Sequence, residues 1–430
     1  MKIGFILLVL LTVFISGCYQ NYKNLEIASS NSVEQQKNVE PEGSQGKAND
    51  LPQGGTKHEK EDEEIDLPSC GDKKELFSIP PLKLEDFTNI IPLGNLAPSA
   101  HVIPTPHLYL SIRKENPSEE DGMPASVPVY APADITITEI ELTEALNKPD
   151  FTDSGIKFYV CKEFKAYFDH VKNLNPKIKE AFDKAPTDLC HEYTLQYGKE
   201  VGAIDWKFCR KNVNVIIEAG EQIGTAGGGS GQKAFDFGAF DYRIKPHVFA
   251  NPNTWRYKSD LYYVVCGLDY FAKELKNELK SRLGKGGMLR QAEPVCGEVV
   301  QDIPGTLQGN WIPKGFGNVG EDNPYLALVH DNLDPSKPVF SVGTYLVNYG
   351  MDFGVYYFDK KRAGLISRDF GDVKDDQVYC YENFKNERDE EKSLIILVQL
   401  VNKDELRIEG QNKERCGNSW KFTDYAEFRR

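Results

Sequence analysis

The 430-residue sequence has little basic charge. It contains 51 Lys and Arg residues against 65 Asp and Glu residues, so the formal net charge is −14. Proteins that bind nucleic acid neutralise phosphates with a basic face, and this balance argues against nucleic acid as a partner. The nine cysteines form no C-x-x-C pair, which argues against a thiolate zinc site and a thioredoxin-like redox motif. The sequence also lacks the Gly-x4-Gly-Lys-Ser/Thr phosphate loop and the Gly-x-Ser-x-Gly nucleophile elbow.

The apolar run at the start of the sequence, residues 3–15, is too short to span a bilayer. It follows Lys2 and ends at Ile15-Ser-Gly-Cys18. This pattern is typical of a signal peptide that ends in a bacterial lipobox, and the alternative is an ordinary signal peptide with an incidental cysteine. We therefore expect residues 1–18 to be removed. Acyl chains on Cys18 would then hold the protein on the extracytoplasmic face of a cell membrane or outer membrane.

Residues 19–66 contain no Phe or Trp and carry 11 acidic residues against five lysines, a net charge of −6. Such a segment cannot bury enough apolar surface to offset the entropy of ordering it. We expect a disordered acidic tether between the lipid and the folded part. The run at residues 59–64 fits a solvated spacer better than a calcium site, because it lacks the Gly-punctuated carboxylate spacing of a calcium loop.

Eight cysteines remain once Cys18 is set aside, and an even number in an exported chain is consistent with up to four disulfides. Proximity and placement in the sequence favour two pairs, Cys190–Cys209 and Cys380–Cys416. The sequence leaves the other pairings open.

The stretch from Val213 to Asp241 has the most distinctive pattern. A β-branched strand at residues 213–217 is followed by a turn, a short apolar resumption and a loop of small residues at 224–231. A second strand is predicted at residues 234–240. This strand carries three aromatic residues, Phe235, Phe237 and Phe240, which do not share one face. We therefore expect some of them in the core and one exposed.

Other elements are predicted on both sides of this stretch. They are two short strands within 127–140, a strand at 156–160, a helix at 176–185, an extra loop at 190–209 and an amphipathic helix at 268–283. We expect His170 on a short helix or turn. From Cys296 onward, short apolar runs alternate with turn residues, which predicts a β-rich C-terminal domain at 291–430, a barrel or sandwich. The whole chain is predicted to be mainly β with a few helices.

Several of these segments resemble the lysostaphin-type (LytM-like) zinc endopeptidases, which cleave peptidoglycan cross-bridges. Residues 213–241 resemble the closing segment of that family. Pro128 to Ile137 resembles its Pro-Val-x-Ala-Pro segment, and Tyr167 to Leu174 its Tyr-x-His-Leu segment. The resemblance implies a central antiparallel β-sheet domain of the duplicated hybrid type at residues 67–290, with residues 190–209 as a disulfide-clipped insertion.

The family holds zinc with two histidines and an aspartate and uses two further histidines for proton transfer. The resemblance places Ala234 and Asp236 at the closing His-x-His motif, and His170 at the other catalytic histidine. The upstream ligand pair falls near His101 and His107, in an open register. In an extended chain these two histidines lie about 20 Å apart, unless the turn at residues 104–106 folds them together.

Each candidate also has a simpler explanation. His101 and His107 fit surface or hydrogen-bonded histidines, His170 fits a structural residue, and Asp236 fits the partner of a nearby cation. The favoured hypothesis is an inactive endopeptidase-like domain that binds the cell wall or another envelope protein, with no cofactor. One alternative is an active zinc metallopeptidase with an altered ligand set, in which His101 or His107, His170 and Asp236 hold the metal. The other is an interaction protein that works through its C-terminal β-domain.

The lipobox hypothesis is tested by Cys18→Ser. Serine lacks the thiol that is acylated, so the variant is expected to lose its lipid and leave the membrane fraction. Cell fractionation and the mass of the intact protein measure both effects. A variant that stays in the membrane fraction to the same extent would contradict the hypothesis.

Overall fold

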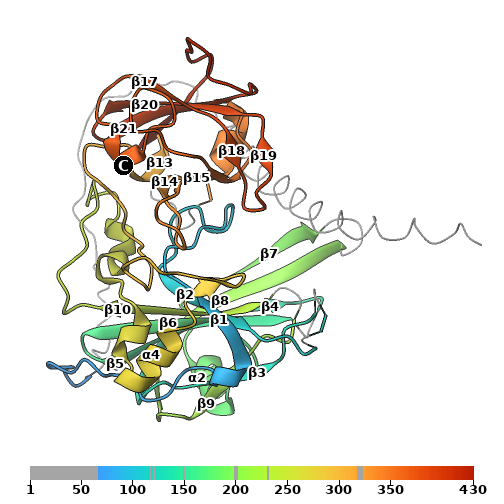
Figure 1. Ribbon diagram of the computed structural model, residues 1–430. Helices are drawn as coiled ribbons and strands as arrows, with labels where there is room; N and C mark the ends of the chain where they lie inside the picture. The colour runs from blue at the N-terminus through green and yellow to red at the C-terminus, as the bar shows by residue number, and fades with distance from the viewer. Residues whose placement is uncertain are drawn as a thin grey trace, which may run out of the picture.

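The computed structural model describes residues 66–116, 118–119, 122–148, 151–197, 202–229, 232–316 and 323–430. The expected signal peptide, Cys18 and nearly all of the expected tether lie outside these ranges. The chain is mainly β, with large antiparallel sheets, so the predicted fold class is confirmed (Figure 1). No helix in the described ranges is long and apolar enough to cross a membrane.

The first sheet has eight strands in the order β1-β2-β10-β6-β5-β4-β8-β7, all paired antiparallel. Its strands are β1 (Phe87–Ile91), β2 (His107–Ile112), β4 (Ile135–Ala145), β5 (Thr152–Cys161), β6 (Phe164–Val171), β7 (Leu189–Tyr197), β8 (Gly202–Ile217) and β10 (Ala234–Asp241). A two-stranded sheet pairs β3 (Val127–Tyr130) with β9 (Gln222–Ala226). The strands expected at 127–140, 156–160, 213–217 and 234–240 are all present.

Strand β10 lies inside the sheet between β2 and β6, and both of its faces are covered. On one face the Phe235 and Phe237 rings pack against Phe168, with centroid distances of 4.9 and 5.5 Å. On the other face Phe240 stacks on Tyr167 at 5.8 Å. The three β10 rings are therefore buried on opposite faces, and none of them is exposed.

The helix expected at 176–185 is present as α2 (Pro176–Lys184), whose first turn is capped by the Asn175 side chain. The continuous helix expected at 268–283 is wrong. The chain forms the 3-10 helix η3 (Gly267–Tyr270), becomes extended at Phe271, and then forms α4 (Lys273–Lys280). Phe271 is fully buried against Phe77, so core packing overrides the local helical pattern. The other 3-10 helices beside the first sheet are η1 (Leu84–Asp86) and η2 (Arg256–Tyr263).

Four disulfides join the eight described cysteines. They are Cys70–Cys161, Cys190–Cys209, Cys266–Cys296 and Cys380–Cys416. The two pairings expected from the sequence are therefore confirmed. The segment expected to be an extra loop is instead the β7–β8 hairpin, in which Cys190 and Cys209 stand opposite each other on paired strands.

The second sheet has ten strands and curls into a half-barrel, in the order β17-β20-β21-β22-β13-β14-β15-β16-β18-β19. Its strands are β13 (Gly309–Pro313), β14 (Leu326–His330), β15 (Pro338–Val342), β16 (Gly354–Tyr357), β17 (Val378–Tyr381), β18 (Phe384–Lys385), β19 (Glu391–Lys392), β20 (Ile395–Asn402), β21 (Glu405–Gln411) and β22 (Ala426–Arg429). Two short 3-10 helices accompany it, η4 (Thr344–Tyr349) and η5 (Phe370–Asp372).

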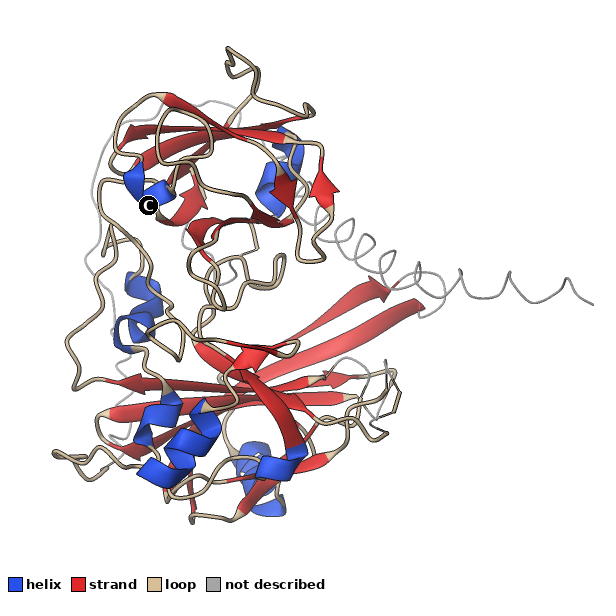
Figure 2. Cartoon of the chain, in the orientation of Figure 1, coloured by secondary structure: helices blue, strands red, loops and turns tan. Residues whose placement is uncertain are grey.

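Each large sheet has its own hydrophobic core. Figure 2 shows the strands in two groups, with the second sheet above the first. The groups touch in more than one place: Leu96, from the loop between β1 and β2, packs against Val329 and Val355 of the second sheet, and Ile312 of β13 belongs to the core of the first sheet. The small hairpin of β11 (Gly284–Lys285) and β12 (Met288–Leu289) lies in the chain between the two sheets.

Loop length predicts unequal contributions from the disulfides. In the chain-entropy model, closing the 91-residue loop of Cys70–Cys161 stabilises the fold by about 4.6 kcal/mol, and closing the 19-residue loop of Cys190–Cys209 by about 3.2 kcal/mol. Replacing Cys70 and Cys161 by serine is therefore expected to lower the free energy of unfolding more than replacing Cys190 and Cys209 by serine. Urea unfolding of the two double variants without reductant measures this difference, and an equal or reversed order would contradict it.

Candidate functional site

Neighbouring strands β2, β10 and β6 bring polar side chains together on one face of the first sheet. Alternate residues of a strand face the same side, and residues in register stand opposite one another. Two consecutive rows across the three strands are His107, Gly238 and Tyr167, and then Tyr109, Asp236 and Asp169. The opposite face of β10 carries Phe235 and Phe237 and belongs to the core. A polar face is thus built into the middle of the sheet.

Gly238 makes room for the first row. A Cβ atom at this position would lie 2.0 Å from the ring of Tyr167, so only glycine lets that ring cross β10. The Tyr167 hydroxyl lies 2.8 Å from Nδ1 of His107. Burial raises the pKa of Tyr167 well above its usual value, so the hydroxyl keeps its proton and donates it to Nδ1. The N–H of neutral His107 is then on Nε2, which points toward Asp236.

Asp236 is the centre of the cluster. Its Oδ2 atom lies 3.3 Å from Nε2 of His107 and 3.6 Å from Nε2 of His170. The residue is only 3% exposed. Burial raises the pKa of Asp236 to about 8, although the charge of His170 opposes this rise. At neutral pH the Asp236 carboxyl group is therefore largely protonated, and it becomes a charged partner of His170 only as the pH rises through about 8.

His170 reaches this face because the end of β6 is irregular. It lies in β6, so the expected short helix or turn is wrong. Phe168 faces the core, and regular alternation would send His170 to the same side. Its φ of 67° breaks that alternation and turns the ring toward Asp236. The Nδ1 atom lies 2.9 Å from Oδ2 of Asp153, and the side chain is 40% exposed, so the cluster meets solvent here.

His107 and His170 differ in charge at neutral pH. Burial lowers the pKa of His107 well below its usual value, and the charges of His101 and His170 lower it further. Burial also disfavours charge on His170, but its hydrogen bond to Asp153 and the charge of Asp236 raise its pKa to about 9. His107 is therefore neutral and His170 is a cation.

His101 joins the cluster from the loop before β2. The loop folds back through an antiparallel bridge between Ala97 and His101, and the His101 and His107 ring centroids lie 5.5 Å apart. Backbone hydrogen bonds between Thr105 and residues Gly94 and Asn95 also keep this loop folded, so the long separation of an extended chain does not apply. All four residues singled out from the sequence meet at one place: His101, His107, His170 and Asp236.

Zinc does not fit this donor set as it stands. In the described ranges, no three His, Cys, Asp or Glu side chains form a group able to hold a metal ion. Metal ligands must be deprotonated, whereas His170 is protonated and both of its ring nitrogens face carboxylates. The His170 cation occupies the position beside Asp236 that a metal would need.

Sequence analysis missed two carboxylates of this site, Asp153 and Asp169. Burial raises the pKa of Asp169 to about 6. Gly155 leaves room for the Asp169 side chain, because a Cβ at position 155 would lie 2.6 Å from Oδ1 of Asp169. Alternation along β6 puts Asp169 on the same side as Tyr167 and was a usable signal. Asp153 had no such signal, because its contact with His170 depends on an irregular register between β5 and β6.

Comparison with known proteins found no matching family model, no matching curated protein and no matching solved structure. The resemblance to the LytM-like endopeptidases therefore rests on the sequence segments alone.

The cluster predicts a stability that depends on pH. The folded-state pKa values of His170 and Asp236, about 9 and about 8, both lie above their usual values of 6.5 and 3.8. The folded chain thus holds more protons than the unfolded chain, so this contribution falls as the pH rises. His170 stabilises fully below about pH 6.5 and loses its effect as the pH passes about 9.

The variant His170→Gln isolates this contribution. We expect the difference in Tm between the wild type and the variant to be largest near pH 6.5 and to shrink above about pH 9. Thermal unfolding across this range measures it, with the exposed His191→Gln as the matched control. A difference that stays constant with pH would contradict the assignment of a cation at His170.

Proposed function

We propose that the chain is a lipid-anchored extracytoplasmic protein whose central domain is a non-catalytic relative of the LytM-like endopeptidases. It acts by binding the cell wall or another envelope protein. The observation that carries the proposal is the position of the His170 cation, whose Nε2 atom lies 3.6 Å from the buried Asp236 carboxyl group and whose Nδ1 atom is paired with Asp153. A protonated histidine in this position is not a metal ligand, because ligand atoms must be deprotonated.

The residue beside Asp236 on the same face supports a binding role. Ala234, which the resemblance places at a catalytic histidine, pairs with Ser111 on β2. Neither a methyl group nor an ordinary serine hydroxyl takes up a proton at neutral pH. This end of the polar face therefore lacks a group for acid–base chemistry.

Four disulfides support the extracytoplasmic part of the proposal. Disulfides persist in oxidising compartments and are rare in the cytosol. Together they join all eight cysteines of the described residues, as expected for a chain that folds after export. The lipid anchor is proposed from Cys18 and the preceding residues alone.

Metal content tests the proposal against the zinc enzyme. We expect the full-length protein, extracted in detergent and purified without reductant or chelator, to contain far less than one zinc ion per chain. We also expect its Tm to be unchanged by a chelator, because the cluster is stabilised by its own charges. Elemental analysis and thermal unfolding measure the two quantities.

The opposite result would favour the altered ligand set. About one zinc ion per chain, lost in Asp236→Ala and His107→Ala but kept in the exposed His191→Ala control, would contradict the proposal. Zinc would then have to displace the proton of His170, and binding would strengthen as the pH rises.

A further inference from the structure

A large cleft lies at the β18–β19 end of the second sheet, beside the loop after β1 and the β11–β12 hairpin. It encloses about 1240 Å³, more than the roughly 300–1,000 Å³ of ordinary small-molecule pockets. These three segments form its walls. The size points to a ligand larger than a cofactor.

The walls offer main-chain edges and both signs of charge. Strand β19 ends the order of the second sheet, and β12 belongs to a two-stranded hairpin, so both present an unpaired edge near the cleft. Such edges pair with extended peptides. The charged lining residues include Lys337, Lys385, Lys392 and Arg415 together with Asp334, Glu387, Asp389 and Glu391. This mixture suits a peptide better than a polyanion.

A smaller pocket of about 230 Å³ adjoins the cleft, sharing Asp331 and Asn332 with it. Arg290 lines this pocket and is only 5% exposed. Its Nε atom donates to the carbonyl oxygen of Pro294 and its Nη1 atom to that of Asn332, at 2.9 and 2.6 Å. Within the described part of the chain, no hydrogen bond or ion pair uses its Nη2 atom. A buried guanidinium with donors to spare is a built site for a carboxylate.

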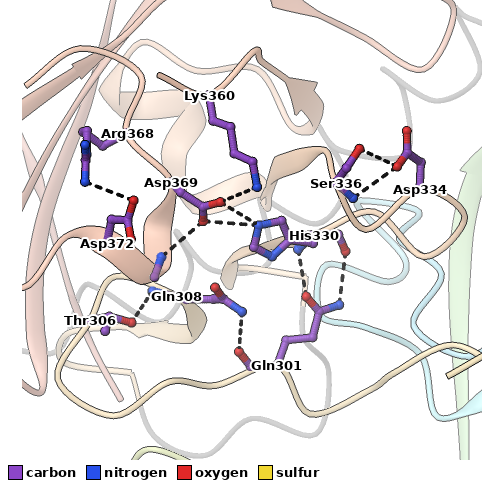
Figure 3. Close-up of polar contacts among 11 residues, drawn as sticks. Gln301, Thr306, Gln308, His330, Asp334, Ser336, Lys360, Arg368, Asp369 and Asp372 are labelled. Atoms are coloured by element: carbon purple, nitrogen blue, oxygen red, sulfur yellow. Dashed lines mark hydrogen bonds and ion pairs between the residues drawn. The ribbon is translucent and has the colours of Figure 1, made fainter. Parts of the chain in front are cut away.

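The other polar groups of the small pocket are already engaged. Figure 3 shows Gln301 bonded to both backbone groups of His330, and Gln308 bonded to the Gln301 carbonyl oxygen. The His330 ring faces Asp369, which also pairs with Lys360. These contacts make a fixed floor and leave little capacity for a ligand.

The two acidic side chains of the small pocket, Asp331 and Glu298, differ in how many hydrogen bonds they make. Asp331 accepts hydrogen bonds from the backbone of Leu333 and Asp334 and from the Tyr357 hydroxyl. Glu298 is exposed, and within the described residues it makes no hydrogen bond or ion pair, although its charge acts on Arg290. The pocket therefore holds one cation with a spare donor, Arg290, and one acidic side chain close enough to influence what that cation binds, Glu298.

We propose that the cleft binds an extended peptide and that Arg290 receives the free carboxylate at its C-terminus. The Nε and Nη1 donors hold the Arg290 side chain in place, and its Nη2 donors bind the carboxylate of the peptide in the small pocket. Glu298 at the rim weakens the binding of this negative group by repulsion. The site is separate from the histidine–aspartate cluster and does not depend on the function proposed for that cluster.

The test measures binding of fluorescent peptides to the full-length protein in detergent by anisotropy. One probe ends in an L-residue with a free carboxylate, one ends in D-Ala-D-Ala, and the third is the C-terminal amide of the first. We expect at least one of the two acids to bind about tenfold or more tightly than the amide, since a charge-assisted bond is lost in the amide. The two acids distinguish a protein C-terminus from a peptidoglycan stem peptide.

Two variants locate the carboxylate. Arg290→Gln is expected to weaken the acid to the level of the amide, and Glu298→Gln to tighten the acid about threefold while leaving the amide unchanged. Glu192→Gln, on exposed β7, is the matched control. Arg290 also donates hydrogen bonds to two backbone carbonyl groups, so Arg290→Gln can fail to fold. In that case the effect of Glu298→Gln on binding of the acid tests the proposal. Equal binding of acid and amide, no binding of any probe, or no effect of Glu298→Gln would overturn the proposal.

Discussion

The burial of the Asp236 carboxylate in the middle of the first sheet is the constraint on which the site depends. Charge on this group is costly in the protein interior, so burial raises its pKa to about 8. Nε2 of neutral His107 lies 3.3 Å from its Oδ2 atom without forming a hydrogen bond, and Nε2 of the His170 cation lies 3.6 Å from the same atom. Gly238 makes room for Tyr167, and the left-handed backbone at His170 turns its ring toward the carboxylate.

The surroundings of Asp236 differ from those of a catalytic zinc site. Such a site has deprotonated ligands and keeps a coordination position open for water, whereas Asp236 has the His170 cation beside it. The proposed binding role rests on this difference and on the resemblance in the sequence. Beside the second sheet is a cleft whose walls come from both halves of the chain, and the buried Arg290 lines a smaller pocket that adjoins it. The two sites lie in different parts of the fold and serve different proposed roles.

Local patterns predicted part of the first sheet, and they missed β1, β2, β6, β7 and the first half of β8. The β-branched residues at 213–217 and the alternation at 234–240 gave correct strands, and proximity gave two of the disulfides. The gathering of His107 and Asp236 depends on β2 pairing with β10, which no local pattern reveals. The turn of the His170 ring requires a positive φ that a non-glycine residue rarely adopts, and the break at Phe271 comes from core packing.

The protonation state of the two histidines tests the central claim most directly. Nitrogen-15 NMR of histidine-labelled protein at neutral pH distinguishes a doubly protonated ring from each neutral tautomer. The account predicts that His170 carries protons on both nitrogens, that neutral His107 carries its proton on Nε2, and that added zinc leaves both sets of signals unchanged. A neutral His170, or signals of both rings that shift together when zinc is added, would contradict it.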